Sequence, residues 1–270
     1  MKIIKTIANL KKNIFKTKNL GFVPTLGNLH QGHISLIKKS TSHCSKTLVT
    51  IYVNPTQFNN KKDFINYPRN INKDLKILKK CKVDYVFLPK TSEIYKKRSF
   101  NKLLIHRNKK ILCGKYREGH FEGVINIIDR FLRLINPDFM FLGEKDFQQL
   151  FLIKHYVKKR FKVKIIQCKT IRNKSYVALS SRNNLLSKKD MKKASLITKE
   201  LIFLKKKINA NNKYKKNINI FKRYLINKFH IKIEYLELRN EKDLSVYNKK
   251  SKFRLFVAYY INHVRLIDNF

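Results

Sequence analysis

Two histidines three residues apart, His30 and His33, are the side chains in this sequence best placed to bind a phosphate. The apolar run Leu20 to Pro24 predicts a strand before them, and Ile34 to Ile37 predicts a helix after them. The first N–H groups of a helix lack partners and its dipole is positive there, so an anion is favoured at this point. Gly32 leaves room for a nucleotide near the backbone. A single histidine at a helix start is more often a cap or a surface residue, and two can be coincidence or a metal pair. Zinc, however, prefers a spacing of four and a third ligand, which the sequence does not suggest.

Two further polar segments follow apolar runs. Asn54 and Gln57 carry amides that both donate and accept, which suits a small hydroxyl-bearing or carboxylate substrate, although a turn amide is the plainer interpretation. In the segment Gly143-Glu144-Lys145-Asp146, the lysine suits a phosphate whose charge grows in a transition state, and the aspartate could hold ribose hydroxyls. A charged helix cap is the alternative for this second segment.

Two loops complete the set of candidate anion sites. The segment Leu179-Ser180-Ser181-Arg182 groups two hydroxyls with a guanidinium, which could bind a triphosphate. A helix-capping serine and a surface arginine are the alternative interpretation. The segment from Arg117 to Gly123 resembles a further anion-facing loop before a helix.

Alternating strands and helices are predicted for the first part of the chain. The expected strands are Leu20 to Thr25, Lys46 to Val53, Val83 to Leu88, Asp138 to Leu142 and Val163 to Cys168; the expected helices begin near His33 or cover Ile71 to Cys81, Phe121 to Ile135 and Asp146 to Phe161. This alternation predicts a Rossmann-like parallel sheet, whose ligands bind at the carboxyl ends of the strands.

The pattern changes near Ile171. Helices are expected from Lys188 to Ile208 and from Lys216 to Phe229, and strands from Ile231 to Leu238, Lys252 to Tyr260 and Val264 to Ile267. We therefore predict a domain over residues 1–170 and a smaller α+β domain over residues 171–270.

The charge of the chain is extreme, with 62 Lys and Arg against 17 Asp and Glu and a net charge of +45. The excess is spread along the whole length and lysine dominates it, as expected from drift towards A+T-rich codons. No pattern typical of a nucleic-acid-binding fold accompanies it, so no nucleic-acid partner is expected. No membrane partner is expected either, because the apolar runs are too short. Four widely spaced cysteines favour reduced thiols in a cytoplasmic protein.

Taken in order, the motifs resemble those of the pantothenate synthetase (pantoate:β-alanine ligase) family within the HxGH nucleotidylyl-transferase superfamily. The resemblance runs essentially from end to end and rests on VPTLGNLHQGHISL, VNPTQF, YPR, GHFEGV, GEKDFQQL, LSSRN and the terminal RLIDN. It implies ATP-dependent ligation of pantoate to β-alanine through a pantoyl adenylate, with release of diphosphate and AMP. Other nucleotidylyl transferases, aminoacyl-tRNA synthetases and a nucleic-acid-binding module remain the alternatives.

The resemblance also implies roles for individual residues. His33, His30, Lys145 and Arg182 would be catalytic; Gln57, Gln149 and Asn54 would bind pantoate, and Gln57 would also border the β-alanine path. Mg²⁺ would accompany ATP without direct side-chain ligands, with Asp74 a weak candidate near it, and a homodimer is implied. The residues expected to contact ATP are Leu26, Gly27, Asn28, Leu29, His30, Gln31, Gly32, His33, Gly143, Glu144, Lys145, Asp146, Ile171, Leu179, Ser180, Ser181 and Arg182.

Three positions depart from the family pattern without removing a reacting group. Leu26 stands where methionine is usual, a change that conserves volume. Glu118 replaces a proline, which loosens the turn before Gly119, and Lys73 replaces an acidic residue beside Asp74.

Overall fold

A computed structural model describes residues 1–95, 103–210, 217–247 and 252–270 of the chain. The chain divides into two compact units, one of Met1–Glu144 with Gln149–Lys169 and one of Lys145–Gln148 with Thr170–Phe270. The short segment Lys145–Gln148, which the sequence assigned to the first domain, therefore belongs to the second unit.

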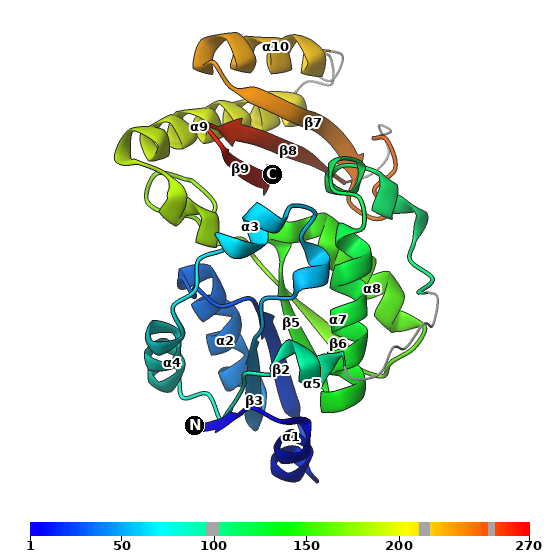
Figure 1. The fold of residues 1–270 in the computed structure, drawn as a ribbon. Coiled ribbons are helices and arrows are strands. Elements are labelled where there is room, and N and C mark those ends of the chain that lie inside the picture. Colours follow the sequence, from blue (N-terminus) through cyan, green and yellow to red (C-terminus); the bar gives the residue numbers. More distant parts are fainter. Residues whose placement is uncertain (96–102, 211–216, 248–251) are drawn as a thin grey trace. The chain divides into compact units, whose positions relative to one another are not determined.

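A parallel sheet forms the centre of the first unit (Figure 1), as predicted. Its strands lie in the order β1-β4-β3-β2-β5-β6, so that β2, the first strand expected from the sequence, is internal. The edge strand β1 was not predicted. The bounds are β1 (Lys2–Ile4), β2 (Leu20–Thr25), β3 (Lys46–Ile51), β4 (Tyr85–Phe87), β5 (Phe139–Gly143) and β6 (Lys164–Cys168).

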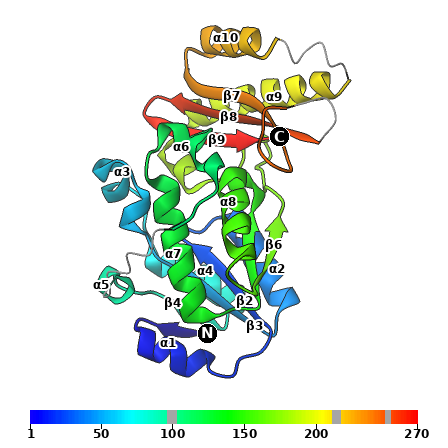
Figure 2. The same cartoon turned by 90° about the vertical axis from the view of Figure 1, so that its right-hand side faces the viewer.

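Helices cover both faces of this sheet (Figure 2). Helices α2 and α4 lie on one face, and α1, α7 and α8 lie on the other. The helices are α1 (Ile7–Ile14), α2 (Gln31–His43), α3 (Lys61–Ile65), α4 (Ile71–Lys80), α5 (Thr91–Ile94), α6 (Cys113–Tyr116), α7 (His120–Ile135) and α8 (Phe147–Lys158), with 3-10 turns η1 (Pro55–Gln57), η2 (Arg107–Lys110) and η3 (Glu144–Asp146).

Aromatic side chains fill the space between the sheet and α7. The ring of Phe131 meets those of Phe22 and Phe87 edge to face, with centroids 5.9 and 6.3 Å away. All three side chains are buried, and edge-to-face pairs of this kind add stability beyond the area they bury. These contacts hold β2 and β4 against α7.

Strands β2 and β5 pair over a short distance. Their register covers Gly21 and Phe22 of β2, whereas pairing of β2 with β3 continues to Thr25. The carbonyl of Leu20 accepts from Asp138, so alternate residues from Leu20 onward face β5, and Pro24 is one of them. Proline has no N–H to donate, so the ladder on this side ends and the two strands are free to separate at their carboxyl ends.

The second unit contains an antiparallel sheet in the order β7-β8-β9. Helices α9 and α10 pack on it through a core that includes Ile197, Leu201, Leu225 and Val257. Its elements are η4 (Ser181–Leu185), α9 (Lys188–Ala210), α10 (Ile218–Phe229), β7 (Lys232–Asn240), β8 (Phe253–Ile261) and β9 (Val264–Asn269). The α+β character predicted for this region is confirmed, although Lys216, the expected start of one helix, lies outside the described residues.

No helix in the described part of the chain combines the length and the apolar character needed to cross a membrane.

Candidate functional site

The loop after β2 places both histidines at the start of α2. The turn begins with Gly27 and Asn28 at positive φ, a conformation that glycine and asparagine adopt most readily. His30 is the N-cap of α2, and its Nδ1 accepts the N–H of Gly32 at 3.1 Å. The Nδ1 of His33 accepts the N–H of His30 at 3.4 Å, so the two side chains form a reciprocal capping box.

These contacts fix the tautomers of His30 and His33. A ring nitrogen that accepts an N–H carries no proton, so the proton of each neutral imidazole lies on Nε2. Nε2 is then the donor nitrogen of each ring, and the ring centroids lie 4.1 Å apart. Paired donors at a helix start suit an anion, which is the chemistry expected from the sequence.

Asp74 of α4 stabilises this loop through hydrogen bonds to its backbone. Its carboxylate is buried and accepts the N–H groups of Asn28 and Leu29, both at 2.8 Å. A side chain at Gly27 would meet the Asp74 carboxylate at 3.0 Å. Burial raises the pKa of Asp74, and the two N–H groups oppose that rise. Asp74 is therefore engaged in shaping the histidine loop, and its expected place near Mg²⁺ stays a prediction.

Gln57 lies in the turn η1 beyond β3 and is buried. The Nδ1 of His120 donates to the Gln57 carbonyl at 2.7 Å, and Arg117 donates to the same oxygen at 3.4 Å. Arg117 also reaches the Nε2 of His120 at 3.0 Å, which fits an acceptor nitrogen because Nδ1 holds the proton. The segment around Arg117, expected to face an anion, thus has these two side chains turned towards Gln57.

Asn54 supports the same turn from inside the fold. Its side chain has no exposed area, its Nδ2 donates to the carbonyl of Gly123, and its Oδ1 accepts from Tyr95 and Thr56. An amide occupied in this way cannot readily turn to a ligand without leaving buried groups unpaired. Asn54 therefore positions the Gln57 turn, and its direct contact with pantoate stays a prediction.

At the end of β5, Gly143 and Glu144 belong to the first unit. A side chain added at Gly143 would meet nothing within 4 Å, so the backbone is open to a close approach there. The Glu144 carboxylate accepts from Gln167 of β6 at 2.6 Å. Gln149, the other amide expected to bind pantoate, lies in α8 and is half-buried.

The second unit carries the remaining candidates, including Lys145 and Asp146. The Lys145 ammonium lies 3.5 Å from the Asp146 carboxylate, and the Lys145 side chain is 19% exposed. Ser180 caps η4 by accepting the N–H of Arg182 at 3.3 Å, and Ser181 is buried.

Ile171 lies beside the same loop. Its carbonyl accepts the N–H of Leu179 at 3.0 Å, so the Ile171 backbone and the Ser180–Arg182 loop are joined directly.

The candidate residues thus fall into two sets. The first unit carries the histidine loop after β2 and the Gly143 end of the neighbouring strand β5, and it also orders Gln57. The second unit holds Lys145, Asp146, Ile171 and the Ser180–Arg182 loop. The supporting contacts of Asp74, Arg117 and His120 were not predicted. Arg117 and His120 lie in the segment that was expected to face an anion, but residue types alone do not reveal the direction of their side chains.

A parallel sheet with helices on both faces and two histidines at the helix start after β2 defines an α/β protein of the Rossmann-like class. The model of the pantoate-beta-alanine ligase family matches residues 2–270, and the chain belongs to that family.

Relatives of known name cover the whole chain. The chain is 38% identical to "Pantothenate synthetase" of Clostridium botulinum (strain ATCC 19397 / Type A), over 100% of this chain and 99% of the relative. It is 39% identical to the "Pantothenate synthetase" of Leptospira biflexa (strain Patoc 1 / Ames), over 100% and 98%.

Solved structures agree. The crystal structure of pantothenate synthetase from Thermus thermophilus matches with a TM-score of 0.90 at 28% identity, over 100% of this chain and 99% of that one. The pantoate-beta-alanine ligase from Francisella tularensis, complexed with beta-gamma ATP and beta-alanine, matches with a TM-score of 0.81 at 37% identity, over 100% and 97%.

Proposed function

We propose that this protein is a ligase that condenses (R)-pantoate with β-alanine at the expense of ATP, giving pantothenate, AMP and diphosphate. Membership of the pantoate-beta-alanine ligase family over residues 2–270 supports the reaction. The observation that carries the site is the pair of Nε2–H donors that the capping contacts of His30 and His33 create at the start of α2.

The proposed reaction proceeds in two steps. A pantoate carboxylate oxygen attacks the α-phosphorus of ATP, the bond to the bridging oxygen breaks, and diphosphate leaves with the electron pair. The β-alanine amine, after losing a proton, then attacks the acyl carbon of pantoyl adenylate and expels AMP. The first step brings two anions together, so positive charge and N–H donors must offset their repulsion.

Charged and donor groups from both units suit this first step. We assign His30 and His33 as donors to the phosphates, and Lys145 and Arg182 as the cations that stabilise charge on the departing diphosphate. The backbone of Leu26 to Gly32, Gly143, Glu144, Asp146, Ile171 and the loop Leu179 to Ser181 are the remaining proposed ATP contacts.

The pantoate and β-alanine sites are assigned to the amides. Gln57 has its carbonyl tied down by His120 and Arg117, which leaves its backbone well ordered to present the side chain. We assign Gln57, Gln149 and Asn54 to the pantoate site, Asn54 through the turn that it supports, and Gln57 also borders the path of β-alanine. Residues 1–170 would then bind ATP and pantoate, and residues 171–270 would serve as a lid that carries the serine-arginine loop and excludes water.

Mg²⁺ fits this scheme as part of the MgATP substrate. Among the described residues, no three His, Cys, Asp or Glu side chains are grouped so as to hold a metal ion. Asp74 is committed to the N–H groups of Asn28 and Leu29. We propose that the ATP phosphates would be its main ligands, as the family resemblance implies, and that Mg²⁺ would supply charge neutralisation there. We also propose a homodimer, as the family resemblance implies, and a cytoplasmic location, as the widely spaced cysteines favour.

The test is to incubate the protein with MgATP, pantoate and β-alanine and to measure AMP and diphosphate. We expect diphosphate release that requires pantoate but not β-alanine, and pantothenate only when all three substrates are present. Absence of AMP above background from folded protein would overturn the proposal. Release of AMP without pantoate would point instead to simple ATP hydrolysis.

A further inference from the structure

Lys145 lies between two elements of the first unit in sequence, yet its closest structural ties are to the second. Strand β5 ends at Gly143, and α8 continues into the first unit from Gln149 onward, but Lys145–Gln148 groups with Thr170–Phe270. Something in the second unit must therefore hold this short segment.

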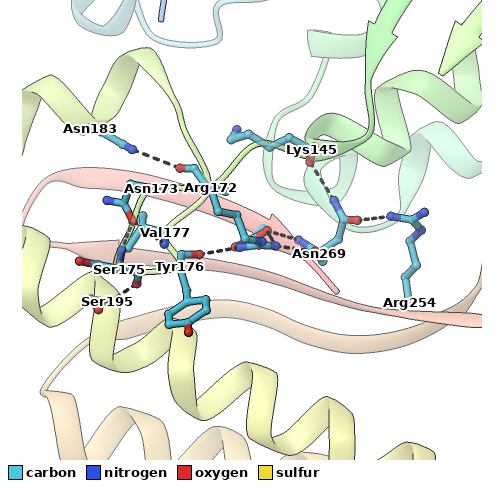
Figure 3. Close-up of polar contacts among 12 residues, drawn as sticks. Lys145, Arg172, Asn173, Ser175, Tyr176, Val177, Asn183, Ser195, Arg254 and Asn269 are labelled. Carbon is cyan, nitrogen blue, oxygen red and sulfur yellow. Dashed lines mark hydrogen bonds and ion pairs between the residues drawn. The ribbon is translucent and has the colours of Figure 1, made fainter. Parts of the chain in front are cut away.

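Asn269, at the end of β9, makes that attachment (Figure 3). Its Nδ2 donates to the carbonyl of Lys145 at 2.9 Å. The other polar groups of Asn269 are also engaged: Oδ1 accepts from Arg254 at 2.8 Å, the N–H donates to the Asp268 carboxylate at 2.7 Å, and the carbonyl accepts from Arg172 at 3.2 Å. With 4% of its surface exposed, Asn269 is fixed on four sides.

Arg254 of β8 gives the segment a second point of attachment. Its guanidinium lies over the ring of Phe147, 4.2 Å from the centroid, while it also bonds to Asn269 and to Glu241. Phe147 is buried and its ring lies 5.9 Å from that of Phe256. The main chain of Lys145 and the side chain two residues later are thus both held by the sheet.

The end of β9 is itself anchored. Arg172 makes a bidentate ion pair with Asp268 at 2.7 and 2.9 Å, and both side chains are largely buried. Bidentate guanidinium–carboxylate pairs combine strength with a defined geometry. Strand β9 also packs against η4, the turn that contains Ser181 and Arg182. One strand therefore contacts both of the segments of this unit that are proposed to bind phosphate.

We propose that Asn269, oriented by Arg254, is a positioning residue for Lys145. It fixes the Lys145 backbone, and with it the origin of the ammonium-bearing side chain, relative to the loop of Ser180 to Arg182. This inference rests on the proposed function, because Lys145 has a catalytic role only if ATP is cleaved at its α-phosphorus and diphosphate leaves. It gives the terminal RLIDN motif, which the assigned substrate contacts leave unused, a role in catalysis through position.

The test compares Asn269→Ala with a matched variant, Asn240→Ala. Asn240 is equally buried, belongs to the same sheet, and donates from Nδ2 to Ser245 at 2.6 Å. We expect both variants to lower the denaturation midpoint, but we expect only Asn269→Ala to slow pantoate-dependent diphosphate release, by about 10 to 100-fold as for other residues that orient an active group. The KM values for pantoate and β-alanine should stay within about twofold, because their proposed contacts are elsewhere.

A second variant covers the case in which Asn269→Ala does not fold. Asn269→Asp keeps the shape and still accepts from Arg254, but it removes the donor to the Lys145 carbonyl, so we expect the same slow release. A double variant with Lys145→Ala should be no slower than Lys145→Ala alone, since Asn269 acts through the lysine.

Normal release by folded Asn269→Ala, or losses that multiply in the double variant, would overturn the inference. Failure of the wild-type protein to form AMP would instead overturn the proposed function.

Discussion

At the scale of single residues, the backbone decides what the two histidines can do. Both Nδ1 atoms accept main-chain N–H groups, so each ring can donate from Nε2 without gaining a proton. Such a donor does not require a protonated ring, so it can bind a phosphate even at a pH above the usual pKa of histidine. The His-x-Gly-His spacing thus provides a cap, and in the proposed function the same side chains also contact the phosphates.

Substitutions at His33 can separate these two roles. Asparagine places an oxygen near the position of Nδ1 and keeps the cap, but it lacks the Nε2 donor. We expect His33→Asn to unfold at nearly the wild-type denaturant concentration while diphosphate release slows by about 100 to 1,000-fold, as for loss of one transition-state donor. His33→Ala should lose both properties. If His33→Asn turned over normally, the phosphates would have to bind elsewhere.

Asp74 gives a prediction about pH. Burial raises its pKa in the folded protein, so proton binding favours folding. Its contribution to stability is fully present below the unfolded pKa and is lost as the pH rises through the folded pKa. The side chain of Asp74→Asn does not titrate. As the pH is lowered from about 7 to about 4, the unfolding free energy of the wild type should therefore increase relative to that of the variant. Urea unfolding of both proteins across this range would show it, and a constant difference would contradict it.

At the scale of elements, the contact between α7 and η1 sets the position of Gln57. Gly123 of α7 lies so close to η1 that an added Cβ would come within 2.3 Å of the Thr56 carbonyl and 2.7 Å of the Gln57 Cα. The same glycine accepts from Asn54, which caps the turn. The helix and the turn can therefore approach only because this residue has no side chain.

Gly123→Ala should push this turn away from the helix. We expect a loss of about 1–3 kcal/mol in stability, typical of overpacking, together with a raised KM for pantoate because Gln57 moves. Denaturant unfolding and initial rates at varied pantoate would measure the two effects. The control for stability is Gly143→Ala, where a Cβ would meet nothing within 4 Å. Equal stability of the two variants would show that α7 tolerates the shift.

The predicted elements are defined by local sequence patterns, whereas the elements that were missed depend on residues far away in the sequence. Strand β2 is a run of apolar residues bounded by polar ones, so its bounds, Leu20–Thr25, were predicted as observed. Strand β1 spans three residues, Lys2–Ile4, and exists through pairing with β4, which no local pattern reveals. The attachment of Lys145 depends on Asn269, 124 residues later. Side-chain direction and long-range partners were the missing information, while the motifs themselves located the candidate loops.

At the scale of the whole molecule, the net charge of +45 creates a positive field that acts on charged substrates. ATP and pantoate are anions, whereas β-alanine is a zwitterion without net charge at neutral pH. A surface field attracts anions over roughly 10 Å at 0.1 M salt and is screened at higher salt. The dispersed lysines can therefore assist capture of two substrates and leave the third unaffected.

We accordingly expect kcat/KM for ATP and for pantoate to fall as KCl rises from about 50 to about 500 mM, while kcat changes little because bound substrates are screened less. β-Alanine serves as the internal control, since its kcat/KM should stay nearly constant over the same range. Initial rates with each substrate varied in turn would measure all three slopes. An equal fall for β-alanine would mean that salt acts on the protein itself, and flat slopes for the two anions would mean that the lysine excess has no part in substrate capture.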